Sequence, residues 1–231
     1  MRVFAIGDLH LEGGTGKTMD RFGDNWIGHD QKIFEAWDQV ASAEDLLILA
    51  GDITWAARLE AAIPDLEKIG RMKGRKIMIR GNHDYWWETK SKLITVLPVS
   101  IEPLQSDATV IGRVAIVGTR GWNCPGSEEF REQDDKIYRR EVGRLRLALE
   151  RLAARNADYD RLIVALHYPP TNSRKEPSGF TELIDEFRAD ACVYGHLHGE
   201  WTQYGLTGRH GSASYYLVSA DFVNFTPARI F

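Results

Sequence analysis

The stretch VFAIGDLH at residues 3–10 introduces a pattern that recurs along the chain. Four apolar residues of strand length run directly into a glycine, an aspartate and a histidine. Because side chains alternate along extended backbone, Asp8 and His10 at positions i and i+2 are expected to face one point. Polar residues at the carboxyl end of a strand indicate a binding site at that edge of an α/β sheet.

Further apolar runs of strand length are LLILA at 46–50, KIMI at 76–79, VAIVG at 114–118, LIVAL at 162–166 and ACVY at 191–194. Helical patterns cover roughly 30–43, 58–71, 85–96 and 134–154. This alternation predicts the α/β class. After His198, residues 201–204 and 213–219 are typical of two hairpin strands around the glycine-rich GLTGRHGS, which indicates a mixed or a second, mostly antiparallel sheet.

Seven metal-capable side chains follow these strands. They are Asp8, His10, Asp52, Asn82, His167, His196 and His198. They are too many for one ion, but if one carboxylate bridges they fill two sites with ions about 3.5 to 4 Å apart. Two divalent ions, two carboxylates and one bridging hydroxide leave a formal charge of about +1, which suits a phosphate ester.

This chemistry predicts hydrolysis of a phosphomonoester or phosphodiester by a metal-bridging hydroxide. The leaving group also needs a proton, and His83, next to a ligand but pointing elsewhere, is the candidate general acid. Asp84 precedes a helical pattern and is interpreted as its N-cap.

Several other features have simpler interpretations. GGTGKT at 13–18 is not a P-loop, because Leu11 stands where the first glycine is required. That loop is either mobile near the site entrance or a plain surface loop. His29 and His210 are expected in loops or on the surface, and Trp86 and Trp87 in packing. Candidates to line the substrate cleft are Arg80, Arg120 and Trp122.

Composition narrows the class of protein. With 231 residues and 43% hydrophobic content, we expect one domain spanning residues 1–231. The net charge of -4 and the absence of basic runs disfavour nucleic-acid binding. No apolar stretch is long enough for a bilayer, and the two cysteines, Cys124 and Cys192, are expected to be free thiols. A cytoplasmic protein without membrane contact is expected, and no pattern sets its oligomeric state.

Read in order, GDLH, GD at 51, GNHD at 81, His167 and GHLH at 195 resemble the signature blocks of the calcineurin-like metallophosphoesterases. GTRGWNCPG and the charged helix after it resemble a bacterial subset of this family. The resemblance implies a four-layer α-β-β-α sandwich with two mixed sheets. It also implies the two ligand sets and their bridge, Asp52, with His83 as proton donor. The sets are Asp8, His10, Asp52 and His198 for one ion, and Asp52, Asn82, His167 and His196 for the other.

The chain departs from the family pattern in one block. Many relatives have a second aspartate shortly after GD, whereas this chain has GDITWAAR, so the group that orients His83 is not identified. The GDxVDRG and GNHE blocks of protein Ser/Thr phosphatases are also absent, which disfavours that subgroup.

Three functions remain open from the sequence. The first is a phosphoesterase acting on a small molecule, with Mn, Fe, Zn, Co or Ni as the two divalent ions. The second is a nuclease that uses the same site. The third is a non-catalytic scaffold on the same fold, like the retromer subunit, although such members lose ligands or the acid and this chain keeps both.

Overall fold

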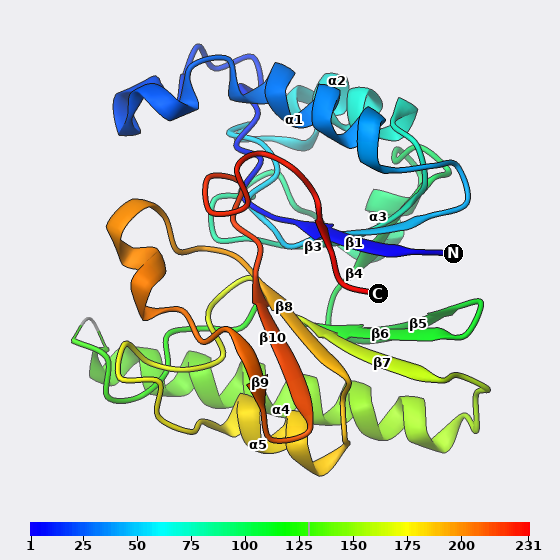
Figure 1. The fold of residues 1–231 in the computed structure, drawn as a ribbon, viewed down its shortest axis with the longest axis vertical. Helices are drawn as coiled ribbons and strands as arrows, with labels where there is room; N and C mark the ends of the chain where they lie inside the picture. Colours follow the sequence, from blue (N-terminus) through cyan, green and yellow to red (C-terminus); the bar gives the residue numbers. More distant parts are fainter. Residues whose placement is uncertain (129) are drawn as a thin grey trace.

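The two sheets of the protein stack face to face, and helices cover both outer faces (Figure 1). The structure, a computed structural model, describes residues 1–128 and 130–231. It confirms the α/β class and the four-layer α-β-β-α sandwich with two mixed sheets.

The first sheet has the strand order β11-β1-β2-β3-β4. Its strands are β1 (Val3–Ile6), β2 (Leu46–Leu49), β3 (Arg75–Ile79), β4 (Ile101–Leu104) and β11 (Ala228–Arg229). β1 to β4 run parallel, and β11 is antiparallel to β1. The register pairs Ile6 with Leu49 and Leu49 with Met78, so the first three strands end at nearly the same level. The residues that follow them therefore meet at one edge.

The second sheet has the order β5-β6-β7-β8-β10-β9. Its strands are β5 (Asp107–Ile111), β6 (Val114–Gly118), β7 (Arg161–Ala165), β8 (Ala191–Tyr194), β9 (Gly208–His210) and β10 (Ala213–Leu217). The four central strands are parallel, and only the edge strands β5 and β9 are antiparallel. The sheet is therefore mixed, and the alternative of a mostly antiparallel second sheet is wrong.

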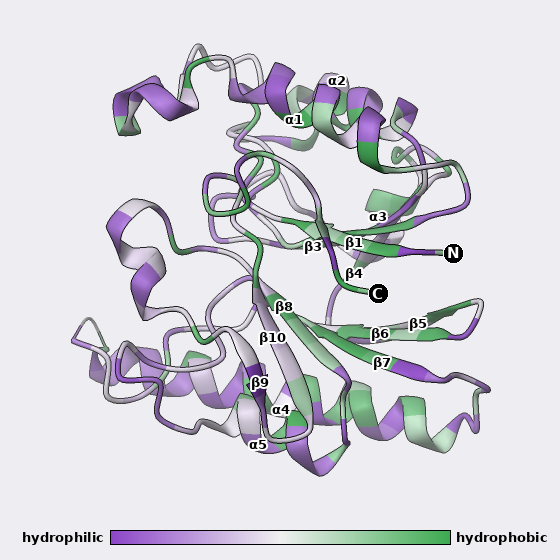
Figure 2. Cartoon of the chain, viewed as in Figure 1, coloured by the Kyte–Doolittle hydropathy of each residue, from purple (hydrophilic) through white to green (hydrophobic). Residues whose placement is uncertain are grey.

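Three apolar layers hold the sandwich together. Ile48, Ile77 and Ile163 belong to the layer between the two sheets. Helices α1 (His29–Val40) and α2 (Leu59–Arg71) cover the first sheet, and α4 (Glu132–Ala154) and α5 (Gly179–Glu186) cover the second (Figure 1). Figure 2 shows that hydrophobic residues concentrate in the strands while the helices also carry hydrophilic ones. Each helix thus buries one face and exposes the other.

Two element predictions are wrong. Residues 201–204 are not a strand but part of the 3-10 helix η3 (Gly199–Tyr204), and the hairpin forms between β9 and β10. The Gly199 amide donates to Asp221, which starts a tight turn there. In the pattern at 85–96, only α3 (Lys90–Ile94) is helical. Trp86 is buried in the turn before it, so that segment follows core packing rather than helical periodicity.

No helix among the described residues is long and apolar enough to cross a membrane. The first and last strands lie side by side, since β11 pairs with β1 and the Val3 amide donates to the Phe231 carbonyl at 3.1 Å.

Candidate metal centre

The structure brings all seven predicted ligands to the carboxyl ends of five parallel strands. Asp8 and His10 follow β1, and Asp52 follows β2. Asn82 follows β3, His167 follows β7, and His196 and His198 follow β8. The parallel direction of the strands explains this convergence, because their carboxyl ends meet at one edge.

The reason predicted for the convergence of Asp8 and His10 is wrong. Neither residue is extended, since φ is 57° at Asp8 and 44° at His10. Asp52 and His196 are also left-handed, with φ of 51° and 75°. The direction of these side chains is therefore set by sharp local turns and not by the alternation of an extended strand.

A glycine precedes four of the seven predicted ligands, and two of these glycines allow the loops to approach closely. A Cβ at Gly81 would overlap with the Asp52 carboxylate, and one at Gly195 would overlap with the Asp8 carboxylate. Glycine is therefore required in GN and GH by the packing of neighbouring loops.

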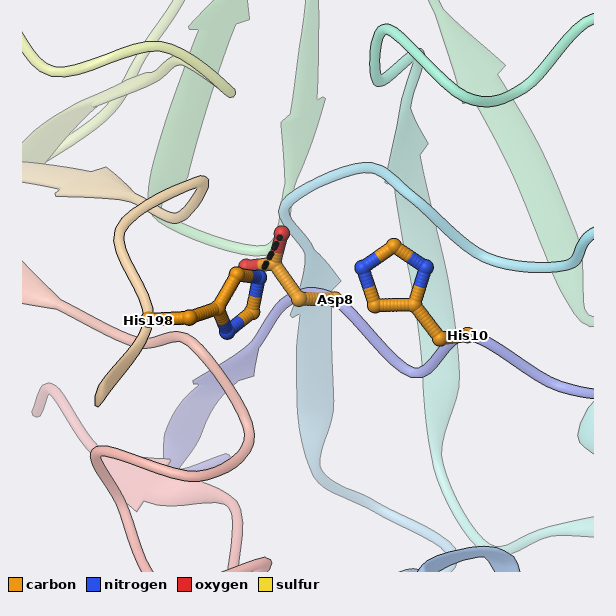
Figure 3. A group of neighbouring side chains, drawn as sticks. All are labelled: Asp8, His10 and His198. Carbon is orange, nitrogen blue, oxygen red and sulfur yellow. Dashed lines mark ion pairs between the residues drawn. The ribbon is translucent and has the colours of Figure 1, made fainter. Parts of the chain in front are cut away.

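The first donor group contains Asp8, His10 and His198, whose ligand atoms lie within 4.8 Å of one another. Figure 3 shows the Asp8 carboxylate beside the His198 ring, with His10 on the other side. His198 Nε2 lies 3.4 Å from Asp8 Oδ1, and His10 Nε2 lies 3.7 Å from Asp52 Oδ2. These four residues are the ones predicted to hold the first ion.

The second donor group surrounds the Asn82 amide oxygen. Asn82 Oδ1 lies 2.6 Å from His167 Nε2 and 2.9 Å from His196 Nδ1. Asp52 Oδ2 lies 3.6 Å from His167 Nε2. Asp52 therefore stands between the two donor groups. Asp8 also lies within 4.8 Å of Asp52 and His167, so the two groups adjoin.

Two ligand rings are fixed from behind. His198 Nδ1 lies 2.8 Å from Asp221 Oδ1, and His167 Nδ1 lies 2.9 Å from the Ala50 carbonyl. Each contact turns the Nε2 atom toward the centre. Sequence reasoning missed Asp221, although it follows a predicted strand at 213–219 as the other carboxylates follow theirs.

The electrostatics of the centre favour an added cation. Burial, together with the charges of Asp84 and Asp8, raises the pKa of Asp52 well above its usual range. Burial, reinforced by His167, lowers the pKa of His196 to about 3. Burial opposes charge on His198, but Asp8 and Asp221 raise its pKa to about 10. A divalent ion would supply the positive charge that the buried Asp52 carboxylate lacks.

Asp84 is not the predicted helix cap. It is fully buried, and its carboxylate accepts hydrogen bonds from the backbone amides of Gly81, Asp52 and Ile53 at 2.7 to 3.0 Å. It also accepts from Trp86 Nε1 at 3.0 Å. Asp84 therefore ties the Asp52 loop to the Asn82 loop.

His83 lies beside the centre but makes no side-chain hydrogen bond among the described residues. Its amide donates to Asp52 Oδ1 at 2.8 Å, and its half-buried ring packs against Trp55 at 4.8 Å between ring centroids. Trp55 also stacks on His10 at 4.7 Å. An indole thus occupies the block where many relatives carry the second aspartate. Burial lowers the pKa of His83.

Other predicted residues have different places. His29 is buried, not on the surface, because its ring lies 3.1 Å from the carbonyls of Trp26 and Leu9 and so supports the first ligand loop. Trp86 and Trp87 are buried as predicted, and His210 is exposed. In the 13–18 loop, Lys17 lies 5.1 Å from the Trp55 ring, so that segment lies beside the site.

A groove of about 420 Å³ adjoins the centre and includes His196 and His198 in its wall. Trp201 and Pro169 line it further out. The three predicted cleft residues do not line this groove. Arg80 and Arg120 line a neighbouring pocket, and Trp122 packs on Tyr168 at 5.0 Å.

The fold and this donor set define a metal-binding phosphoesterase of the two-sheet sandwich class. The sequence model of the calcineurin-like phosphoesterases matches residues 1–200, so the chain belongs to this family.

Two solved structures have a similar fold. One is a protein of unknown function from Aquifex aeolicus, which is 15% identical with a TM-score of 0.53 over 99% of this chain and 95% of that chain. The other is the phosphopantetheinyl hydrolase of Mycobacterium tuberculosis, which is 18% identical with a TM-score of 0.57 over 94% of this chain and 88% of that chain. At these identities the likeness concerns the fold alone. Among curated proteins, none matches the chain.

Proposed function

We infer that the chain hydrolyses a small phosphomonoester or phosphodiester with two divalent metal ions. One observation carries this inference: two adjoining donor groups share the position of Asp52, at a single edge of the sandwich. Oxygen and imidazole donors in this number suit Mn, Fe, Zn, Co or Ni.

The residues present fit two ions. Asp52 Oδ2 lies within 3.7 Å of an imidazole nitrogen from each donor group, as a bridging carboxylate requires. One ion would be held by Asp8, His10, Asp52 and His198, and the other by Asp52, Asn82, His167 and His196. When bound, the ions would supply positive charge to the phosphate oxygens and acidify a water for attack.

The protein groups orient these donors and keep the site rigid. Asp221 holds the His198 ring and the Ala50 carbonyl holds the His167 ring. Asp84 accepts hydrogen bonds from the loop that carries Asp52 and from the loop that carries Asn82, and so links the two. Such preorganisation lowers the cost of reorganisation during reaction.

His83 is the group we assign to protonate the leaving oxygen. Its ring lies 5.8 Å from that of His10, near the donors yet outside their contacts. Burial favours its neutral form, and a bound phosphate would favour the protonated form through its negative charge.

The groove supports a small substrate rather than a polymer. Its aromatic wall includes Trp201, which is 54% exposed, and Tyr204. A net charge of -4 disfavours electrostatic capture of nucleic acid.

The test is a substrate panel on chelator-treated protein reloaded with each metal. The panel contains p-nitrophenyl phosphate, bis-p-nitrophenyl phosphate and single-stranded DNA. We expect metal-dependent turnover of the monoester or diester, and at least a 100-fold loss in Asp52→Asn but not in the surface control His210→Gln. Preference for DNA, with a rate that falls as salt rises, would favour the nuclease. No turnover with any metal would favour the scaffold.

A further inference from the structure

A second polar pocket, of about 180 Å³, lies next to the metal centre. Four arginines line it together with Thr119 and Glu141. The arginines are Arg80, Arg120, Arg140 and Arg144. Arg80 directly follows β3 and Arg120 comes two residues after β6, whereas Arg140 and Arg144 belong to α4. The pocket has room for several waters and so for a small anion.

Only part of this positive charge is neutralised by the protein. Glu141 is 1% exposed, and its carboxylate lies 2.6 Å from Arg144 Nη1 and 3.6 Å from Arg140 Nε. The Thr119 hydroxyl also donates to Glu141. The single carboxylate of Glu141 therefore forms ion pairs with both arginines of α4.

Arg80 and Arg120 have no such partner. Within residues 1–128 and 130–231, no carboxylate lies within 4.0 Å of either guanidinium. Arg80 Nε is buried and has no hydrogen-bond partner there. Because a buried donor without an acceptor is costly, this atom indicates a missing acceptor.

Arg120 is held in place by an aromatic ring rather than by a direct ion pair. Its guanidinium lies 4.5 Å from the centroid of the Trp122 ring, a cation–π contact that fixes the side chain. A positioned guanidinium with unused donors is suited to a planar or tetrahedral oxyanion.

We propose that this arginine pocket binds a phosphate-sized anion. Arg80 stands two residues before Asn82, and the Arg120 carbonyl accepts from the His167 amide at 3.0 Å, so the pocket adjoins the second donor group. The anion has two possible sources. One is a second phosphoryl group of the substrate, which rests on the proposed function, and the other is free phosphate, which does not.

The first experiment is calorimetric titration of inorganic phosphate into the full chain. Metal-loaded protein should bind two phosphates per chain, and chelator-treated protein should keep one. Arg80→Gln and Arg120→Gln should each weaken phosphate binding at the metal-independent site at least tenfold. Arg120→Lys should weaken it less, because lysine keeps the positive charge but lacks the planar pair of N–H donors of a guanidinium. Arg146→Gln, at an exposed α4 arginine paired with Glu186, is the matched control and should change neither site.

The outcomes separate this proposal from the proposed function. If metal-loaded and chelator-treated protein each bind one phosphate, and that binding depends on Arg80 and Arg120, the result would contradict the metal centre and support the arginine pocket. A chain that binds no phosphate after chelation, or folded Arg80 and Arg120 variants with unchanged affinity, would overturn the pocket. Thermal melting of each variant shows whether it is folded.

A second experiment distinguishes the two sources by comparing KM for fructose 1,6-bisphosphate and fructose 6-phosphate. If the substrate supplies the anion, Arg120→Gln should raise KM for the bisphosphate at least tenfold while leaving kcat and KM for the monophosphate nearly unchanged. If free phosphate is the ligand, neither KM should change, and the calorimetric site should remain sensitive to Arg120→Gln. If Arg120→Gln changes neither the KM for the bisphosphate nor the calorimetric affinity for phosphate, the proposal is refuted.

Discussion

Four of the predicted ligand residues, Asp8, His10, Asp52 and His196, carry a left-handed backbone. For residues other than glycine this conformation costs about 1 to 2 kcal/mol each. The loop after β2 supports it at two of these residues, since the Asp8 amide donates to the Gly51 carbonyl at 2.8 Å and the His10 amide to the Asp52 carbonyl at 2.9 Å. The rest of the fold therefore stabilises a local geometry that serves the site.

At His198, the supporting carboxylate gives a direct prediction. Asp221→Ala should weaken metal binding about 10- to 100-fold, because Asp221 fixes the ring whose other nitrogen faces the centre. Metal titration of the folded variant measures this. Asp158→Ala removes an exposed carboxylate that pairs with Arg113 and serves as control. Equal metal affinity in both variants would show that Asp221 has no orienting role.

His83→Gln tests the proton donor. The variant should retain its metal, because the ring contacts no donor atom by hydrogen bonding within the described residues. Turnover of an alkyl phosphate should fall about 100- to 10,000-fold, whereas turnover of a nitrophenyl ester, whose leaving group needs no proton, should fall far less. Undiminished activity on the alkyl phosphate would reject the role.

At the level of elements, Asp84 links the turns after β2 and β3. Asp84→Ala would leave three backbone amides and the Trp86 indole without their acceptor in a buried place. We expect a loss of about 2 to 4 kcal/mol in the free energy of unfolding, measured by urea denaturation. Asp135→Ala, at a partly exposed position on α4 where the carboxylate pairs only with Arg139 among the described residues, is the control. A loss below about 0.5 kcal/mol would contradict the structural role of Asp84.

The starts of β1 and β2 are joined by Asp45. Hydrogen bonds from Arg2, and others from Ser42, hold the pKa of this carboxyl below its usual range despite its burial. Since the folded pKa is depressed, the stabilisation is complete above the ordinary value of about 3.9 and is lost as pH falls below it. Arg2 is 42% exposed, so solvent screening limits the size of the effect.

Unfolding free energies of Asp45→Asn and the parent chain, measured from pH 7 to pH 2, test this linkage. The difference between the two should be largest near neutral pH and should shrink toward pH 2. A difference that stays constant over the range would contradict the depressed pKa.

Across the whole molecule, the sequence predicted the strands well because apolar runs such as those at 46–50 and 191–194 are buried on both faces. The place of the seven predicted ligands at one edge has the same explanation, since each comes shortly after such a run. The pattern could not show which residues become buried through distant contacts. The local position of Asp84 suggests a helix cap, but two of its four hydrogen-bond partners come from the distant Asp52 loop. His29 likewise depends on the carbonyl of Leu9.

The second sheet shows the same limit. Residues 201–204 have the composition of a strand, yet the contact between Gly199 and Asp221 bends the chain into η3. β4, β5 and α5 were not predicted, since their apolar residues are few or interrupted by polar ones. Local periodicity therefore described the central strands and the long helices, while the edges of the sandwich depended on tertiary contacts.

In the proposed centre, two metal ions share Asp52 at the carboxyl edge of the sandwich. Anomalous scattering from crystals of metal-reconstituted protein tests it most directly. We expect two peaks about 3.5 to 4 Å apart, one beside His10 and His198 and the other beside Asn82 and His167. A single peak, or two peaks away from Asp52, would contradict it.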